Sequence, residues 1–141
     1  MSYSLAFSQS LFMLLYIGGK VELGGFDFVP TQQISHDVNV PPSTAGLILR
    51  QLNRAGLIET REGANGGVRL ARPTDQITVL DVFKAIEQER PLFPKVNLPV
   101  TKVDPTRVQT VVQAALTTAE DTMKASLQTK TLYDLIQEIH Q

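Results

Sequence analysis

The chain has 141 residues, the length of one ordinary domain, and 43% of them are hydrophobic. This composition excludes a wholly disordered, collagen-like or fibrous protein. The sequence contains no cysteine, so the chain itself cannot supply a disulfide, a cysteine-ligated iron–sulfur cluster or a catalytic thiol. We therefore expect a globular protein that holds no cofactor.

The longest apolar run, from Leu11 to Ile17, is seven residues long, whereas a membrane-spanning helix needs about 20. The first seven residues carry none of the basic side chains that begin a signal peptide, so we expect them to belong to the fold. These features favour a cytoplasmic protein with no membrane partner.

The net charge is only −1, but its distribution is uneven. Residues 43–72 hold five arginines against two glutamates, a net charge of +3, whereas residues 1–42 and 103–141 each carry −2. Arginine is well suited to bidentate contacts with phosphate and guanine. The segment therefore favours a nucleic-acid partner, although a merely uneven surface also accounts for a charge of this size.

Two helices are predicted in the first 40 residues. Apolar residues recur at helical spacing over residues 5–17, and the pair Gly18-Gly19 is expected to end that helix. After a glycine-rich loop, Thr31 is expected to cap a short helix that reaches Val38. The prolines at 41 and 42 cannot continue it.

A third helix is predicted over residues 43–55, with Ser43 as its N-cap and Gly56 as its left-handed stop. Its apolar positions follow one face of a 3.6-residue period: Ala45, Ile48, Leu49 and Leu52. Residues 57–61 and 68–72 are short segments rich in strand formers, and the glycine-rich loop between them predicts a hairpin.

The rest of the chain is predicted to be helical apart from one connection. Thr78 and Asp81 resemble a capping box for a helix to about Glu89, with Val79, Val82, Phe83 and Ile86 as its buried stripe. Asp104-Pro105 opens the longest helical pattern, and Thr131 with Asp134 opens a short last helix. The proline-rich connection, residues 90–103, either covers a pocket for an effector or simply ties the two parts together.

A short helix, a tight turn, a second helix and a hairpin follow one another in the order of a winged helix-turn-helix. We therefore predict a mainly α fold with a small β-hairpin. A winged helix-turn-helix domain over residues 1–89 is followed by the connection, residues 90–103. A long dimerisation helix and a short terminal helix complete the chain over residues 104–141.

The predicted second helix of this motif has a polar face that suits the major groove of DNA. Its candidate DNA contacts are Ser43, Thr44, Gly46, Leu47, Arg50 and Arg54, and Arg61 and Arg69 flank the hairpin loop. Leu47 suits a thymine methyl, and Arg50 suits a base edge or a phosphate. The alternative is that Ser43 only caps the helix and the arginines only solvate its surface.

The hairpin region carries a specific resemblance. A glycine-rich loop at 63–67 ends in Arg-Leu-Ala-Arg-Pro at 69–73, and Ile-Thr-x-x-Asp-Val follows at 77–82. This pattern resembles the Rrf2 family of bacterial winged-helix transcription regulators, of the IscR, NsrR and CymR kind. The resemblance covers nearly the whole chain, because a long dimerisation helix also belongs to the family plan.

The resemblance implies a homodimer that binds double-stranded DNA at a pseudo-palindromic operator and usually represses. Family DNA contacts match Pro41, Ser43 and Gly46, and the wing matches over Arg61 to Gly67, which includes Asn65 and Gly66. The chain resembles a member without cluster-ligating cysteines, since residues 90–103 have none. It also has Ala6, Ser8 and Glu62 where the family often has basic residues, and Gly46 replaces a frequent acidic base reader.

The long helix is expected to form the dimer. Its candidate interface residues are Val108, Val111, Val112, Ala115, Leu116, Ala119 and Met123, and the small residues among them allow close helix approach. The alternative is that this stripe packs only on the chain's own core. A dimer would place two recognition helices about 34 Å apart, on successive major-groove faces.

The sequence thus predicts a sequence-specific transcriptional regulator, a repressor, whose effector is an unknown small molecule or protein. The alternative is an adaptor that uses the winged fold for protein contacts without an operator. An enzyme is disfavoured, because no nucleophile lies beside a base and residues 63–67 lack the Lys and Ser/Thr of a phosphate-binding loop.

Overall fold

The computed structural model describes residues 5–88, 90–93 and 104–141. Within these residues it contains six α-helices, one 3-10 helix and one two-stranded antiparallel sheet, which confirms the predicted fold class. The elements are α1 (Leu5–Leu23), α2 (Thr31–Val38), α3 (Pro42–Arg54), β1 (Ile58–Arg61), β2 (Gly67–Leu70), η1 (Thr74–Gln76), α4 (Val79–Glu87), α5 (Pro105–Gln128) and α6 (Leu132–Ile139).

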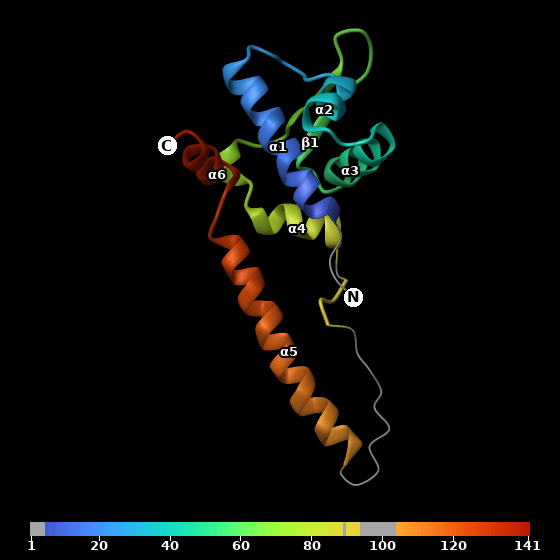
Figure 1. The fold of residues 1–141 in the computed structure, drawn as a ribbon, viewed down its shortest axis with the longest axis vertical. Coiled ribbons are helices and arrows are strands. Elements are labelled where there is room, and N and C mark those ends of the chain that lie inside the picture. Colours follow the sequence, from blue (N-terminus) through green and yellow to red (C-terminus); the bar gives the residue numbers. More distant parts are fainter. Residues whose placement is uncertain (1–4, 89, 94–103) are drawn as a thin grey trace.

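The helices form a body from which one long helix extends (Figure 1). α1 runs through this body, α2, α3 and the hairpin lie on one side of it, α6 lies on the other, and α4 crosses below. The core joins α1, α3 and α4, and includes Met13, Leu14, Ile17, Ile48, Leu52, Val82 and Ile86. α5 meets the body at α4 and then projects away from it. No described helix combines the length and apolar character of a membrane span.

The predicted end of the first helix is wrong, because α1 continues past Gly18-Gly19 to Leu23. Gly18 is buried inside the helix, and a Cβ there would lie 3.3 Å from Leu70 Cδ1. This glycine therefore allows β2 to pack closely on α1, and it does not end the helix. The helix ends at the next glycine pair, where the Gly24 amide donates to the Lys20 carbonyl and Gly25 has φ +71°.

The predicted caps of the next two helices are also wrong. Thr31 is the first residue of α2, and Ser43 lies in the first turn of α3. The N-caps are Pro30 and Pro41, neither of which supplies a side-chain hydrogen bond. Proline suits these starts, because its fixed φ and missing N–H are tolerated at the first turn. The predicted buried stripe of α3 is confirmed, and Gly56 after the helix has φ +77°.

The hairpin is confirmed with slightly shorter strands, and Glu59 pairs with Arg69 across it. The base of the wing also pairs with the loop after α1. Val29 and Val68 exchange two backbone hydrogen bonds of 2.8 and 2.9 Å. A Cβ on Gly67 would lie only 2.1 Å from the Val29 carbonyl oxygen, so glycine is required at this crossing.

Both predicted capping boxes, at Thr78 and at Thr131, are confirmed. The two helix starts lie together, since Leu132 N donates to Ile77 O and Val79 N donates to Lys130 O. α4 ends at Glu87, whereas the predicted end, Glu89, lies outside the described residues. Most of the predicted connection, residues 94–103, also lies outside them.

Candidate nucleic-acid interface

A rigid turn holds α2 and α3 in the helix-turn-helix arrangement. Asn39 ends α2 in the left-handed conformation, with φ 57°. The Ser35 hydroxyl donates to the Val40 carbonyl at 2.6 Å, and the Val40 amide donates to the Ser35 carbonyl at 3.0 Å. The turn is thus closed by its own hydrogen bonds, which fixes the position of α3 relative to the helix before it.

The starts of α2 and α3 both have first-turn amides with no side-chain cap. They lie beside a cavity of about 670 Å³, whose lining includes Thr31, Gln32, His36, Pro42 and Gly46. Because the first amides of a helix and its dipole favour anions, both starts suit phosphate oxygens.

The outward face of α3 is accessible. Leu47 is 53% exposed, Ser43, Arg50 and Arg54 are exposed, and Thr44 and Gly46 are half-buried. A Cβ on Gly46 would lie 3.7 Å from Arg50 Nη1, so the Arg50 guanidinium extends back over the glycine toward the start of the helix. The N-terminal half of α3 therefore combines hydroxyl groups, one large apolar side chain and one guanidinium.

Arg50 and Arg54 differ from the other arginines of segment 43–72. Arg61, Arg69 and Arg72 each form ion pairs with carboxylates of this chain. Within the described residues, no ion pair involves Arg50 or Arg54. These two cations on α3 are therefore available to an external anion.

Arg61 organises the wing. Its guanidinium lies 4.1 Å from the Phe28 ring centroid and 3.6 Å from Asp27 Oδ2, and it donates to the Asn65 carbonyl at 2.7 Å. It therefore joins the wing loop to the segment between α1 and α2. Asn65 is exposed and Gly66 is half-buried, so the loop backbone is accessible at the tip.

Arg69 is held more firmly at the base of the wing. It donates to Glu59 at 2.8 Å, lies 3.4 Å from Asp27 Oδ1, and its guanidinium is 4.6 Å from the Phe28 ring centroid. The hydrogen bond to Glu59 raises the pKa of Arg69 above its usual value. Two carboxylates already share this cation, which favours a structural role for it over a DNA contact.

Asp27 and Phe28 were not predicted from the sequence. They lie in a glycine-rich segment that reads as an ordinary loop, and no periodic pattern links them to the distant arginines. Their role depends on the Val29–Val68 backbone pairing, which brings residues 27 and 28 beside the wing.

A second unpredicted contact joins α1 to α2. The Tyr16 hydroxyl donates to the Asp37 carboxylate, and Gln33 Nε2 donates to the Tyr16 hydroxyl at 3.1 Å. Burial, and then the bond to Asp37, raises the pKa of Tyr16. The same bond lowers the pKa of Asp37. This network holds the helix that supports α3.

The predicted dimer residues of α5 lie along one stripe but differ in exposure. Val111, Val112, Ala115 and Ala119 are exposed, Val111 to 62% and Val112 to 46%. Val108, Leu116 and Met123 are half-buried. No residue of α5 is buried within the chain, so its apolar stripe is incompletely covered.

Comparisons with known proteins agree with this architecture. The family model described as Rrf2, an iron-dependent transcriptional regulator, matches residues 3–138. The protein aau3 of Rhizobium meliloti is 60% identical over 40 residues, 28% of this chain and 26% of that protein. The HTH-type transcriptional regulator IscR of Cereibacter sphaeroides is 31% identical over 64 residues, 45% of this chain and 41% of that protein. This chain thus spans less than half of these relatives' length.

Two solved structures match nearly the whole chain. T. potens IscR matches with a TM-score of 0.71 and 17% sequence identity. The match covers 99% of this chain and 88% of the IscR chain. CymR, the global cysteine regulator of B. subtilis, has a TM-score of 0.68 and 22% identity, with 98% of both chains covered. At such identities the likeness shows the fold alone.

The family description names iron, but the residues of this chain do not fit a thiolate-bound iron centre. The sequence has no cysteine. Within the described residues, no group of three His, Asp or Glu side chains is placed to hold a metal ion.

Proposed function

Because this chain belongs to the Rrf2 family of transcriptional regulators, we propose that it binds a specific DNA sequence as a homodimer and represses transcription from it. The observation that carries this proposal is the open face of α3. Its apolar side is buried in the core, and its other side presents Leu47, Arg50 and Arg54 to solvent. A regulator of this kind acts in the cytoplasm, on the bacterial chromosome.

In this proposal α3 enters the major groove. Ser43, Thr44 and Leu47 meet base edges, with Leu47 against a thymine methyl, while the absence of a side chain at Gly46 permits close approach. Arg50 reads a guanine edge or binds the adjacent phosphate. Arg54, one turn later, contacts the backbone.

Phosphates on either side are held by three features. The uncapped starts of α2 and α3, including Pro41 before α3, offer backbone amides to phosphate oxygens. The wing tip, with Asn65 and Gly66, approaches the neighbouring groove. Arg61 is 46% exposed and orders this tip, whereas Arg69 positions the wing from its base.

The homodimer is supported by the exposed stripe on α5. Val111, Val112, Ala115 and Ala119 form an apolar face with small residues at its centre, which suits close packing against a second copy of the same helix. Two recognition helices related by a two-fold axis match a pseudo-palindromic operator with half-sites about one helical turn apart.

Genome-wide capture of bound DNA fragments tests the proposal and supplies the operator. We expect a short pseudo-palindrome shared by the captured fragments. Binding of the purified protein to that site should weaken steeply as salt rises, because neutralised phosphates release counterions.

Capture of fragments without a shared sequence, or binding that ignores salt, would contradict sequence-specific recognition. Absence of DNA binding together with stable binding of another protein would instead favour the adaptor alternative.

A further inference from the structure

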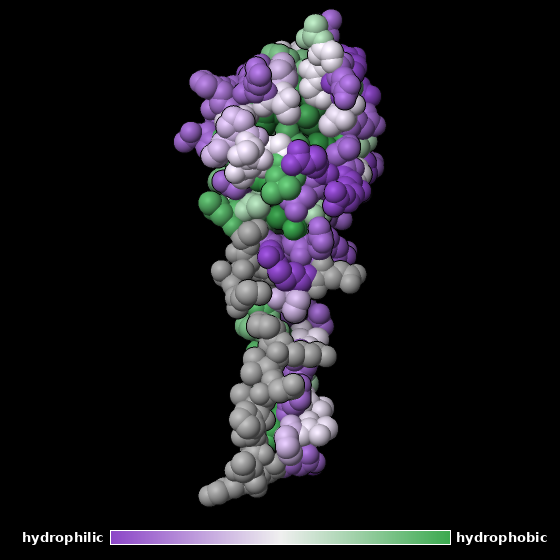
Figure 2. All heavy atoms as spheres, turned by 90° about the vertical axis from the view of Figure 1, so that its right-hand side faces the viewer, coloured by the Kyte–Doolittle hydropathy of each residue, from purple (hydrophilic) through white to green (hydrophobic). Residues whose placement is uncertain are grey.

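A cavity of about 610 Å³ lies between the start of α1, the middle of α3 and the end of α4. Its lining residues are Ala6, Leu47, Gln51, Ile86, Glu87, Gln88 and Arg90. Figure 2 shows this side of the molecule, where an apolar area lies near the lower edge of an otherwise largely hydrophilic body. The volume is within the usual range for small-molecule sites, about 300–1,000 Å³.

A buried ion pair lies in the wall of this cavity. The Glu87 side chain is fully buried, and it accepts a hydrogen bond from Arg90 Nη2. A buried carboxylate is costly unless a cation or hydrogen-bond donors satisfy it, so Arg90 is held beside it. The Arg90 side chain itself is 45% exposed.

Arg90 has more donors than Glu87 uses. A guanidinium carries five N–H groups in a fixed planar arrangement. Within the described residues, the structure gives the Arg90 side chain no second acceptor. The Arg69 guanidinium shows that one arginine of this fold can hold two carboxylates, since Glu59 and Asp27 lie 2.8 and 3.4 Å from it.

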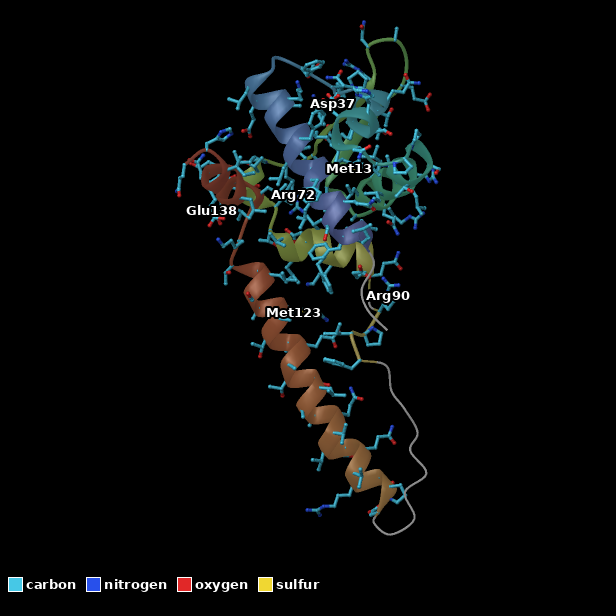
Figure 3. All side chains as sticks on the ribbon, viewed as in Figure 1. Met13, Asp37, Arg72, Arg90, Met123 and Glu138 are labelled. Atoms are coloured by element: carbon cyan, nitrogen blue, oxygen red, sulfur yellow. The ribbon has the colours of Figure 1, made fainter. Side chains whose placement is uncertain are left out.

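The backbone around Arg90 is anchored. The Arg90 amide donates to the Glu87 carbonyl at 3.2 Å, and the Leu92 amide donates to Glu120 of α5 at 2.9 Å. Gln88 has φ 56° and ψ −134°, a conformation that favours glycine. Such backbone strain is retained where the surrounding structure enforces it, often at ligand sites. Figure 3 shows Arg90 just beyond the end of α4.

The lining groups define the ligand chemistry. Ala6, Leu47 and Ile86 offer an apolar wall, the amides of Gln51 and Gln88 offer hydrogen bonds, and Arg90 offers charge-assisted donors. A guanidinium edge matches the paired oxygens of a carboxylate or a phosphate, and one arginine beside an apolar wall favours the singly charged carboxylate. We propose that this cavity binds a small monocarboxylate, with its carboxylate on Arg90 and its apolar part against Leu47 and Ile86.

The position of the site gives ligand binding a consequence for DNA recognition. Leu47 and Gln51 belong to α3, so a ligand that contacts Leu47 competes with its contact to a thymine methyl and lowers operator affinity. By linkage, the operator lowers ligand affinity by the same factor. This consequence rests on the proposed function, whereas ligand binding itself does not.

Titration of the full chain with sodium hexanoate, followed by amide NMR without DNA, tests the site. We expect saturable shifts of the Leu47, Gln51, Gln88 and Arg90 signals. Hexanamide, which has the same shape without the charge, should bind about tenfold more weakly, as expected for loss of a charge-assisted hydrogen bond. Absence of saturable shifts, or equal binding of the two compounds, would overturn the proposal.

Two variants separate binding from folding. Arg90→Gln should weaken hexanoate binding about tenfold, but it also leaves Glu87 buried without its arginine. The double variant Glu87→Gln/Arg90→Gln removes both charges and should bind equally weakly while remaining folded. Arg72→Gln is the matched control, because Arg72 is similarly exposed and pairs with Asp81 outside this cavity. Unchanged hexanoate binding in the folded double variant would exclude Arg90 as the carboxylate ligand.

Once the operator is known, hexanoate should weaken operator binding by the wild-type chain and not by the double variant. If hexanoate binds in the titration but does not change operator affinity, ligand binding at this cavity does not regulate DNA binding. Failure of DNA binding altogether would contradict the proposed function and leave the titration result standing.

Discussion

The Arg61 guanidinium lies 4.1 Å from the ring centroid of Phe28, so the wing rests on a side chain from the loop between α1 and α2. Arg69 contacts the same ring from 4.6 Å, and Asp27 lies within ion-pair distance of both arginines. The wing is therefore positioned by a segment more than 30 residues before it in the chain.

Replacing Phe28 by leucine should loosen the wing. Leucine keeps an apolar side chain but removes the aromatic face, and a cation–π contact at a partly exposed site contributes about 0.5–1 kcal/mol. We expect a loss of that size in the free energy of unfolding and faster hydrogen exchange at amides 64–67. Phe28→Tyr retains the ring and should behave like the wild type. Equal exchange rates in all three proteins would show that the ring does not order the wing.

Gly67→Ala should strongly destabilise the protein. The new Cβ would lie 2.1 Å from the Val29 carbonyl oxygen, at a residue with φ +145°. Backbone strain and overpacking together should cost about 2 kcal/mol or more, measured by urea unfolding. At Gly63, which has φ +99° and no atom within 4 Å of the added Cβ, alanine should cost only about 1 kcal/mol. Similar losses at the two positions would refute the close backbone crossing.

The bond between Tyr16 and Asp37 predicts a pH-dependent stability difference. The pKa of Asp37 is lowered from 3.8 by this bond, so its contribution is present above that value and is lost as the pH falls through the lowered pKa. Tyr16→Phe should therefore be less stable than the wild type at neutral pH, and the difference should shrink in acid below about pH 4.

An NMR titration checks the cause directly. In Tyr16→Phe the pKa of Asp37 should rise toward its usual value, because the hydroxyl whose hydrogen bond lowers it has been removed. A constant stability difference from neutral to acidic pH would contradict a role for the Asp37 carboxylate.

Arg50→Ala should weaken operator binding by about 1–3 kcal/mol. If Arg50 reads a base, the loss should depend on the operator base that it meets. If it binds phosphate, the slope of log affinity against log salt should fall by about one for each protein subunit. Arg72→Ala removes an equal charge that pairs with Asp81 and should have little effect. Unchanged affinity for Arg50→Ala would remove this residue from the interface.

Ala115→Asp should convert the proposed dimer to a monomer, because it places a charge in the centre of the exposed apolar face of α5. Sedimentation velocity at micromolar concentration measures the change, and operator affinity should fall with it. Thr117→Asp, on a different face of the same helix, is the control and should remain dimeric. A wild-type protein that is monomeric under these conditions would refute the dimer proposal.

Periodic patterns in the sequence were sufficient to predict the helix-turn-helix, the hairpin, the buried side of α3, both capping boxes and the long α5. Such features depend on residues a few positions apart, since helix periodicity, capping and tight turns are local. Local patterns were less reliable for helix ends, because Gly18 and Ser43 suit more than one position and the packing of β2 or the prolines before α3 decided between them.

Which arginines are available depends on contacts formed in the folded chain. In the sequence the five arginines of segment 43–72 look equivalent, but Asp27, Glu59 and Asp81 pair with three of them after folding. The cavity beside Arg90 likewise depends on three helices meeting. Such contacts join residues far apart in the chain, and their energy depends on distance and burial in the folded state, which no local pattern encodes.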